Sequence, residues 1–372
     1  MIRVDDNVIN LIEKIRRAIR DGKMPAEDFP MEAISSLIEC TLGETFWKCV
    51  GSKSNLGFAK MPDSYKECLQ DALERKDMED CSRILQLFEC SYLAFYTAMN
   101  EDEVIFRQKP YRKMIIELGM ANAQMQHRLH QQRQKALPKQ EEKPLAEGKG
   151  VVYTCLLGEK ELHQPEEVCG GIDYLCFTDQ EEKWGKQEGV WKYCPIDNSE
   201  KMSANLVKSK YMIMIHELLP EYDYSIWIAP EFMIVGDVLR FCKVYGEGNS
   251  FISFSNSKDD CIYEDLSVTH MQTDDLNIRV RKRMLQYQKE GYPEHNGLID
   301  SRVMVRNHRD EKLHEVMKEW WEEIQNCDSF MGNMFNYVAW KHQFPFSICD
   351  LFVYENPYFV NAEIDLDTNE TY

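Results

Sequence analysis

The chain has 372 residues, of which 44% are hydrophobic, and it carries a formal charge of −19 at pH 7. It can therefore bury a sizeable core, and it has room for roughly two domains of ~100–200 residues each. The acidity argues against a nucleic-acid partner, whose phosphates normally require a basic face on the protein. The start, MIRVDDNVIN, lacks an apolar signal core, and no stretch approaches the ~18 apolar residues of a membrane span. We expect a soluble, cytoplasmic protein.

Cysteine and histidine usage argues against a disulfide scaffold and a zinc site. The thirteen cysteines are scattered without a C-x-x-C pair, which is typical of reduced thiols. The nine histidines show no pair at the spacing of zinc ligands. A zinc enzyme is therefore not expected.

The first third of the chain has a helical pattern. Apolar residues recur there at helical spacing, as in Ile9, Ile12, Ile15, Ile34, Leu37, Ile84, Leu85, Phe88 and Leu118. Residues 137–150, LPKQEEKPLAEGKG, combine prolines, glycines and charges with almost no apolar content. These patterns predict an all-helical N-terminal domain at 1–136 and a linker at 137–150. We see no chemistry in the helical domain and expect it to mediate self-association.

After the linker the period of the apolar pattern changes, and the second domain, 151–372, begins. Strand-like apolar runs occur at 151–157, 172–178 and 224–228. Helical patterns lie between and after them, including 199–217 and an amphipathic stretch at 311–325. This alternation predicts an α/β fold with a mainly parallel sheet flanked by helices.

The segment 221–235, EYDYSIWIAPEFMIV, contains a buried strand that ends in a turn bearing a carboxylate. The apolar run from Ser225 to Ile228 is interrupted by Pro230, and Glu231 follows. Because ligands of open α/β sheets bind beyond such strand ends, this turn is the first candidate for a functional site.

Several sequence blocks resemble a family of glycosyltransferases related to the plant mucilage and pollen-turgor proteins, formerly listed as a domain of unknown function. The resemblance covers about residues 150–350 and rests on the order of YTCLLG at 153–158, DYLCFTD at 173–179, EYDYSIWI at 221–228, CIYED at 261–265, YQKEGYPEHNGLIDSRVMVRNH at 287–308 and EWWEEI at 319–324. It implies a GT-A-like fold and transfer of a sugar from a nucleotide-sugar donor to a glycan or other hydroxyl acceptor.

Such a donor carries two phosphate charges, and its diphosphate leaves as an anion. The site must therefore supply a divalent metal, such as Mn²⁺ or Mg²⁺, or Lys and Arg side chains. The family's W-I-D-G motif would place an Asp where this chain has Ala229 and Pro230, and its R-D-Q-L-S-F block is replaced by residues 330–335, FMGNMF. Both acidic positions of the family pattern are missing.

Two readings follow from these departures. In the first, Glu231 supplies the carboxylate as a catalytic group or metal ligand, and Lys208 or Lys210 contacts the phosphates of the donor. One or two carboxylates together with phosphate oxygens suffice to bind Mg²⁺. In the second, the domain is a catalytically silent GT-A-like module for binding or assembly.

The resemblance also suggests positions around the sheet. Thr154 and Asp179, at the ends of the first two strands, would contact the donor, although Asp179 serves equally well as a turn residue. Asp300 is the second candidate catalytic carboxylate. On the acceptor side the candidates are Asn296, Gly297, Arg306 and His308. Gly297 would permit close backbone approach to a sugar, and His308 would bind metal or phosphate, or be a satisfied loop histidine.

Overall fold

The computed structural model describes residues 6–42, 61–100, 110–135, 137, 145–158, 162–197, 201–246, 248–257, 259–263, 274–327, 334–365 and 370–371. Residues 138–144 of the predicted linker and 330–333 of the FMGNMF block lie outside these ranges. The chain divides into two compact units. The helical unit comprises 1–132, 350–352 and 364–372, and the sheet unit comprises 133–349 and 353–363.

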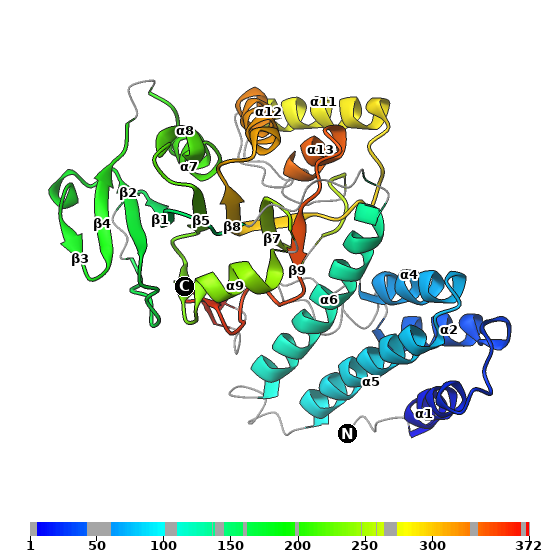
Figure 1. Ribbon diagram of the computed structural model, residues 1–372. Helices are drawn as coiled ribbons and strands as arrows, with labels where there is room; N and C mark the ends of the chain where they lie inside the picture. The colour runs from blue at the N-terminus through cyan, green and yellow to red at the C-terminus, as the bar shows by residue number, and fades with distance from the viewer. Residues whose placement is uncertain are drawn as a thin grey trace. The chain divides into compact units, whose positions relative to one another are not determined.

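The helical unit contains α1 (Asp6–Arg20), α2 (Met31–Leu42), α4 (Met61–Glu74), α5 (Met78–Asn100) and most of α6 (Pro110–Lys135). It also holds the short strands β11 (Ile364–Asp365) and β12 (Glu370–Thr371), which pair antiparallel. The expected helical N-terminal region is confirmed (Figure 1). No described helix is long and apolar enough to cross a membrane.

The apolar stripes predicted from the sequence form the core of this unit. Ile12 and Ile15 of α1, with Ile84 and Phe88 of α5, are almost completely buried. Tyr65 of α4 packs edge-on against Phe88, with ring centroids 5.7 Å apart, and its hydroxyl lies 2.8 Å from that of Ser91. The buried tyrosine hydroxyl therefore keeps a hydrogen-bond partner, as burial of a polar group requires.

The sheet unit is built on eight strands in the order β3-β4-β2-β1-β5-β8-β7-β9. The strands are β1 (Gly150–Leu156), β2 (Ile172–Thr178), β3 (Gln187–Glu188), β4 (Trp191–Pro195), β5 (Tyr224–Ile228), β7 (Phe251–Ser255), β8 (Ile299–Asn307) and β9 (Ser347–Cys349). All run in one direction except β3 and β8, so the mainly parallel sheet is confirmed.

Helices cover both faces of this sheet (Figure 1). On one face lie α7 (Ala204–Ile213), α8 (Ile215–Leu218), α11 (Asp274–Glu290), α12 (Glu311–Cys327) and α13 (Met334–Lys341). They share one apolar core with the sheet, which includes Tyr153, Trp227 and Trp320 of α12. On the other face lies α9 (Val238–Tyr245), whose Phe241 stacks on Phe254 of β7 at 5.6 Å. A small antiparallel pair, β6 (Phe232–Ile234) with β10 (Phe359–Asn361), follows β5.

Candidate functional site

The order of the strands defines a switch point between β1 and β5. From β1 the chain moves outward through β2 and β4, and it then returns to place β5 on the opposite side of β1. In open α/β sheets, ligands bind outside the carboxyl ends of the strands at such a point, because the loops there diverge. The loop after β1, the turn after β5 and the adjoining start of β8 therefore form the candidate site.

The turn after β5 is fixed by β8. The Ala229 N–H donates to the carbonyl oxygen of Arg302 at 2.8 Å, and the Trp227 indole N–H donates to that of Ser301 at 3.0 Å. The Phe232 N–H then closes the turn onto the Ala229 carbonyl oxygen at 2.9 Å. Glu231, at the end of this turn, keeps 24% of its side chain exposed. Its carboxylate is thus presented at the carboxyl end of β5, as the sequence predicted.

A bulge in β8 brings Asp300 and Arg302 to the same edge. The register between β7 and β8 shifts after Ser253. The Ser253 hydroxyl lies 2.7 Å from the carbonyl oxygen of Asp300 and 3.1 Å from that of Val303, on either side of the bulge. Bulges redirect side chains and are enriched beside active sites. Here the bulged segment lies against the turn that carries Glu231.

Arg302 links the carboxylates of this group. Its Nη1 donates to Asp300 Oδ2 at 2.6 Å, and its Nε lies 3.7 Å from Glu231 Oε1. The guanidinium also lies over the Tyr354 ring, 5.0 Å from the centroid. Asp300 raises the pKa of Arg302 above its usual value, and burial raises the pKa of Tyr354 to about 12. The group is therefore a permanent cation between two carboxylates, with a neutral phenol beneath it.

The exposed fractions of the Asp300 and Arg302 side chains differ and indicate different roles. Asp300 keeps only 4% of its side chain exposed and is hydrogen-bonded to both the side chain and the main-chain N–H of Arg302. Arg302 keeps 35% exposed and presents a guanidinium suited to phosphate oxygens. Asp300 thus holds Arg302 in position, while Arg302 and Glu231 remain partly exposed and accessible to a ligand.

The strand ends on the other side of the switch point carry the predicted donor residues. Asp179 follows β2 directly, and its carboxylate accepts the Gly158 N–H at 3.0 Å. Gly158 has a φ of +76°, a left-handed conformation that favours glycine. Thr154 lies two residues before the end of β1, and its buried hydroxyl has no hydrogen-bond partner within the described part of the chain. Such an unpaired buried hydroxyl is uncommon.

Helix α7 carries Lys208, one of the two lysines predicted to contact the donor. The side chain of Ser203 caps the helix by accepting the Leu206 N–H at 3.4 Å. Burial raises the pKa of the Cys155 thiol to about 12, Lys208 lowers that pKa, and Asp179 raises it. Lys208 and Asp179 therefore both lie within electrostatic range of one strand residue.

Lys210 is half-buried two positions farther along α7. A step of two residues turns a helix by about 200°, so Lys210 lies on a different face from Lys208. Of the two lysines predicted to contact the donor, Lys208 is the one that lies, like Asp179, within electrostatic range of Cys155.

Arg306 and His308 lie at the opposite edge of the sheet. Because β8 is antiparallel to β5, the end of β8 adjoins the start of β5. Arg306 is buried and donates to the carbonyl oxygen of Met212 and to the Tyr153 hydroxyl. His308 is buried, with its Nε2 2.8 Å from the Ser225 hydroxyl, and burial lowers its pKa to about 3. The structure therefore separates both residues from Glu231 and Asp300.

Asn296 and Gly297 precede β8 and lie on the same edge of the sheet as Asp300. Gly297 has a φ of +76°, and its N–H donates to the Asp260 carbonyl oxygen at 2.9 Å. A Cβ at this position would lie 3.0 Å from Arg133 Nη1. The close approach that glycine permits is to the Arg133 guanidinium, which itself donates to the His295 carbonyl oxygen at 2.7 Å.

The carboxylates of the candidate site could supply only some of the ligands of a metal ion. Within the described ranges, no group of three or more His, Cys, Asp and Glu side chains is arranged to hold an ion. Asp300 is engaged by Arg302, which leaves Glu231 as the accessible carboxylate of the group. One carboxylate fits Mg²⁺ or Mn²⁺ that takes its other ligands from a diphosphate and water. It does not fit an ion held by the protein alone.

Two members of the group, Arg302 and Tyr354, were missed in the sequence. Arg302 had no reliable signal, because the bulge after Asp300 interrupts the regular alternation of side chains along β8. Tyr354 had none, because it joins the group through the tertiary fold from more than fifty residues away.

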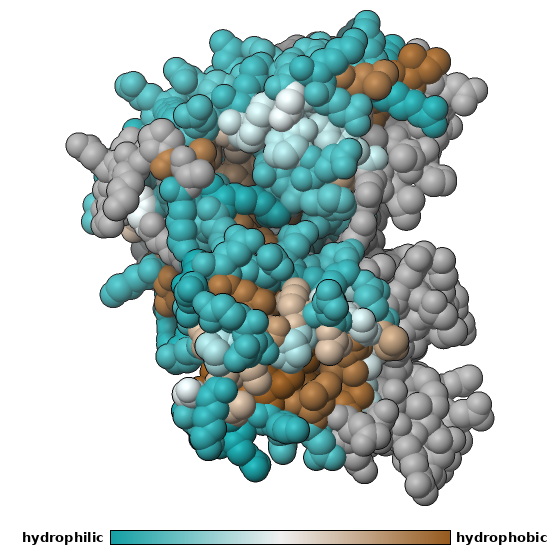
Figure 2. Space-filling model, turned by 90° about the vertical axis from the view of Figure 1, so that its right-hand side faces the viewer, coloured by the Kyte–Doolittle hydropathy of each residue, from teal (hydrophilic) through white to brown (hydrophobic). Residues whose placement is uncertain are grey.

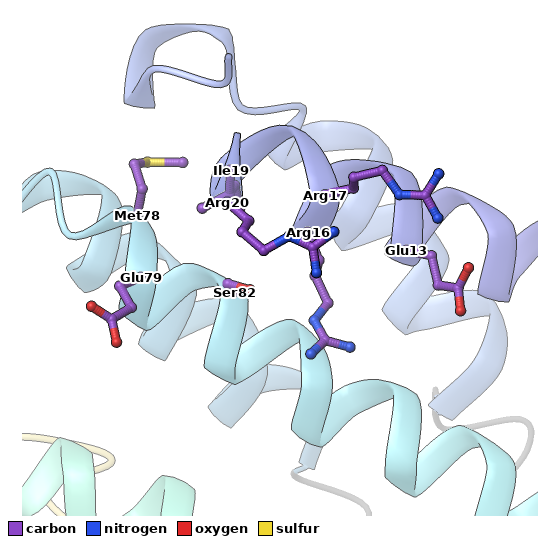
Figure 3. A pocket seen from close by; sticks show the side chains of 8 residues that line it. All are labelled: Glu13, Arg16, Arg17, Ile19, Arg20, Met78, Glu79 and Ser82. Carbon is purple, nitrogen blue, oxygen red and sulfur yellow. The ribbon is translucent and has the colours of Figure 1, made fainter. Parts of the chain in front are cut away.

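A separate cavity of about 650 Å³ lies in the helical unit, between α1 and α5 (Figure 3). It is lined by Glu13, Arg16, Arg17, Ile19, Arg20, Met78, Glu79 and Ser82. Its charges are mixed, and Arg16 is already paired with Glu89 at 2.8 Å. Nothing in this lining selects one class of ligand.

Comparison with known proteins identifies no family. No family model matches the chain, and no curated protein matches it. Among solved structures, it is similar to mouse xyloside xylosyltransferase 1 in its apo form, with 10% identity and a TM-score of 0.30 over 54% of this chain and 84% of the other. It is also similar to the mannosyltransferase Ktr4p from S. cerevisiae, with 12% identity and a TM-score of 0.28 over 65% and 79%. Scores at this level establish neither a shared fold nor a shared activity.

Proposed function

We propose that this protein is a GT-A-like glycosyltransferase that transfers a sugar from a nucleotide-sugar donor to a glycan or other hydroxyl acceptor. The observation that carries the proposal is the placement of Glu231 and Arg302 at the switch point of the sheet. Diphosphate esters need cationic groups there, and the acceptor hydroxyl needs a carboxylate. Both types of group are present at one strand edge, and Asp179, which follows β2, and Lys208 of α7 are the further donor contacts in this proposal.

In the proposed reaction, the acceptor oxygen bonds to the anomeric carbon as the bond from that carbon to the diphosphate oxygen breaks. The diphosphate leaves with the bonding electrons, and the hydroxyl proton passes to a carboxylate. Glu231 is the accessible carboxylate for that proton, and Arg302 and Lys208 would stabilise the charge on the leaving group. The other role open to Glu231 is to hold Mn²⁺ or Mg²⁺, which would supply further positive charge at the diphosphate, and in that role the carboxylate would not also take the hydroxyl proton.

The second candidate function is that of a catalytically silent GT-A-like module for binding or assembly. The observation that favours it is the turn after β5, where Ala229 and Pro230 are buried at the position for which the resemblance implies an Asp. In addition, Arg302 neutralises Asp300. We further propose that the protein is cytoplasmic and that the helical unit mediates self-association.

A thermal-shift screen of nucleotide sugars, with and without Mn²⁺, tests donor binding. A ligand that binds only the folded chain stabilises it by about 2.7 kcal/mol at a hundred times its Kd. The proposal expects at least one nucleotide sugar to raise the melting temperature of the wild type and to have less effect on Arg302→Met. Binding without release of nucleoside diphosphate would favour the silent module, and an absence of any shift across the panel would reject the donor site.

A further inference from the structure

Helix α11 is attached to the sheet unit by one face. Val280, Met284 and Tyr287 are buried, and Tyr287 stacks on Tyr337 of α13 with ring centroids 3.6 Å apart. At the edge of this face, Arg283 Nε donates to Glu323 of α12 at 2.8 Å. These contacts fix the rotation of α11 about its axis and thereby determine which side chains face solvent.

The outward face combines apolar and cationic side chains. Ile278 and Leu285 are 65% and 57% exposed. They are seven residues apart, so they lie within about 20° of one another around the helix. Arg281, Lys282 and Lys289 are exposed and fall on the same side, within about 60° of Ile278. We refer to these five residues as the α11 stripe.

The cations of the stripe are not neutralised by the protein. Within the described part of the chain, Arg281, Lys282 and Lys289 take part in no ion pair, unlike Arg283 on the packed side. Although the chain as a whole has a charge of −19, the α11 stripe gathers three of these cations beside two exposed apolar side chains. In Figure 2, the top of the molecule, where Figure 1 labels α11, is mostly hydrophilic with a few hydrophobic atoms exposed among the hydrophilic ones.

We propose that the α11 stripe docks the protein onto an anionic lipid surface. Exposed apolar side chains on a helix insert shallowly into the headgroup region, and Lys and Arg beside them are attracted to acidic headgroups. The helix also carries acidic residues at its two ends, Asp274 and Asp275 before Ile278 and Glu290 after Lys289, and these oppose the attraction locally. Acidic residues more than about 8–10 Å away oppose it weakly, because such charges are screened at physiological salt.

A protein partner fits the stripe less well. Stable protein interfaces bury about 800 Å² on each side, with a core that is depleted in charged residues. The stripe has only two large apolar side chains, Ile278 and Leu285, and each is bordered by cations. Membrane-surface binding needs no such core, because the bilayer supplies the apolar medium.

Co-sedimentation of the full chain with vesicles tests the proposal. Vesicles of phosphatidylcholine alone are compared with vesicles containing about one-third phosphatidylserine, at low and physiological salt. Binding is expected only to the anionic vesicles. Arg281→Ser with Lys282→Ser should weaken it about 25-fold, since each cation near an acidic surface contributes about fivefold. Ile278→Ser with Leu285→Ser should weaken it at least tenfold by removing inserted apolar area.

A matched control is available on α9, where Val244 is 53% exposed next to the exposed Lys243. Lys243→Ser with Val244→Ser should leave vesicle binding unchanged. Circular dichroism of all variants checks that folding is preserved. No binding to anionic vesicles, equal binding to neutral ones, or equal loss in the control would overturn the proposal. A change of oligomeric state in the stripe variants without any vesicle binding would assign the stripe to a protein contact and would also overturn it.

Discussion

Replacing Arg302 by Met should destabilise the sheet unit through Asp300. The substitution keeps most of the apolar stem of the side chain and removes the guanidinium. Asp300, which is only 4% exposed, then loses its 2.6 Å bond to Arg302 Nη1 and keeps the bond from the main-chain N–H at 3.1 Å. A buried carboxylate left without its partner is strongly disfavoured.

The expected loss of unfolding free energy depends on how exposed the Asp300–Arg302 pair is. A hydrogen bond to a charged group contributes about 1.5–3 kcal/mol to stability. Because Arg302 keeps 35% of its side chain exposed, solvent screens the pair, and we take the lower part of that range, about 1.5–2 kcal/mol. For domains of 150–250 residues, this corresponds to a fall in the melting temperature of about 3–8 °C.

Urea unfolding followed by tryptophan fluorescence measures the effect, and a double-mutant cycle with Asp300→Asn isolates the pair. The double variant should be more stable than the sum of the two single effects predicts, by about 1 kcal/mol. Lys243→Met, at an exposed position on α9, is the control and should change the unfolding free energy by less than about 0.5 kcal/mol. Additive single effects would show that Asp300 does not depend on Arg302, and the reasoning would be refuted.

Three further predictions concern the donor site and pH. Glu231→Gln should remove any stimulation of donor binding by Mn²⁺ with little change in melting temperature. Ala229→Asp should increase the affinity for Mn²⁺ in calorimetric titration. If the metal dependence is unchanged in both variants, Glu231 is not the metal ligand. Lys208→Ala should weaken nucleotide-sugar binding about 10- to 150-fold, and Lys210→Ala should weaken it less. If both variants bind the donor as tightly as the wild type, neither lysine contacts the phosphates. Burial lowers the pKa of His308 from 6.5 to about 3, so below pH 6.5 the unfolded chain takes up a proton that the folded chain does not. Between pH 6.5 and 5 the wild type should therefore lose about 1.5 kcal/mol more stability than His308→Gln in urea unfolding, and parallel losses would contradict the assigned environment.

Much of the fold was predictable because its local patterns are strong. The strand expected at 224–228 coincides with β5, and the amphipathic pattern at 311–325 became α12. Interruption of the apolar run by Pro230 correctly indicated a turn at a strand end. The position of Glu231 at the edge of the sheet followed from that turn, since parallel strands place their carboxyl ends together.

The remainder of the site depended on strand direction and on long-range contacts. A sequence pattern does not state whether a strand runs parallel or antiparallel to its neighbours. Because β8 is antiparallel, Arg306 and His308 lie at the opposite edge from Asp300, although all three belong to one short segment. Similarly, the β8 bulge is held by Ser253, which is distant in the sequence, so no local signal indicated how Arg302 would reach Glu231.

The most direct test of sugar transfer is release of nucleoside diphosphate from a panel of nucleotide sugars, measured with and without Mn²⁺. The wild type is expected to release it from at least one donor. Glu231→Gln should release little or none, while Lys243→Met should match the wild type. Failure of the wild type to release nucleoside diphosphate from any donor, or equal release by Glu231→Gln, would contradict the proposed role of the strand-end site.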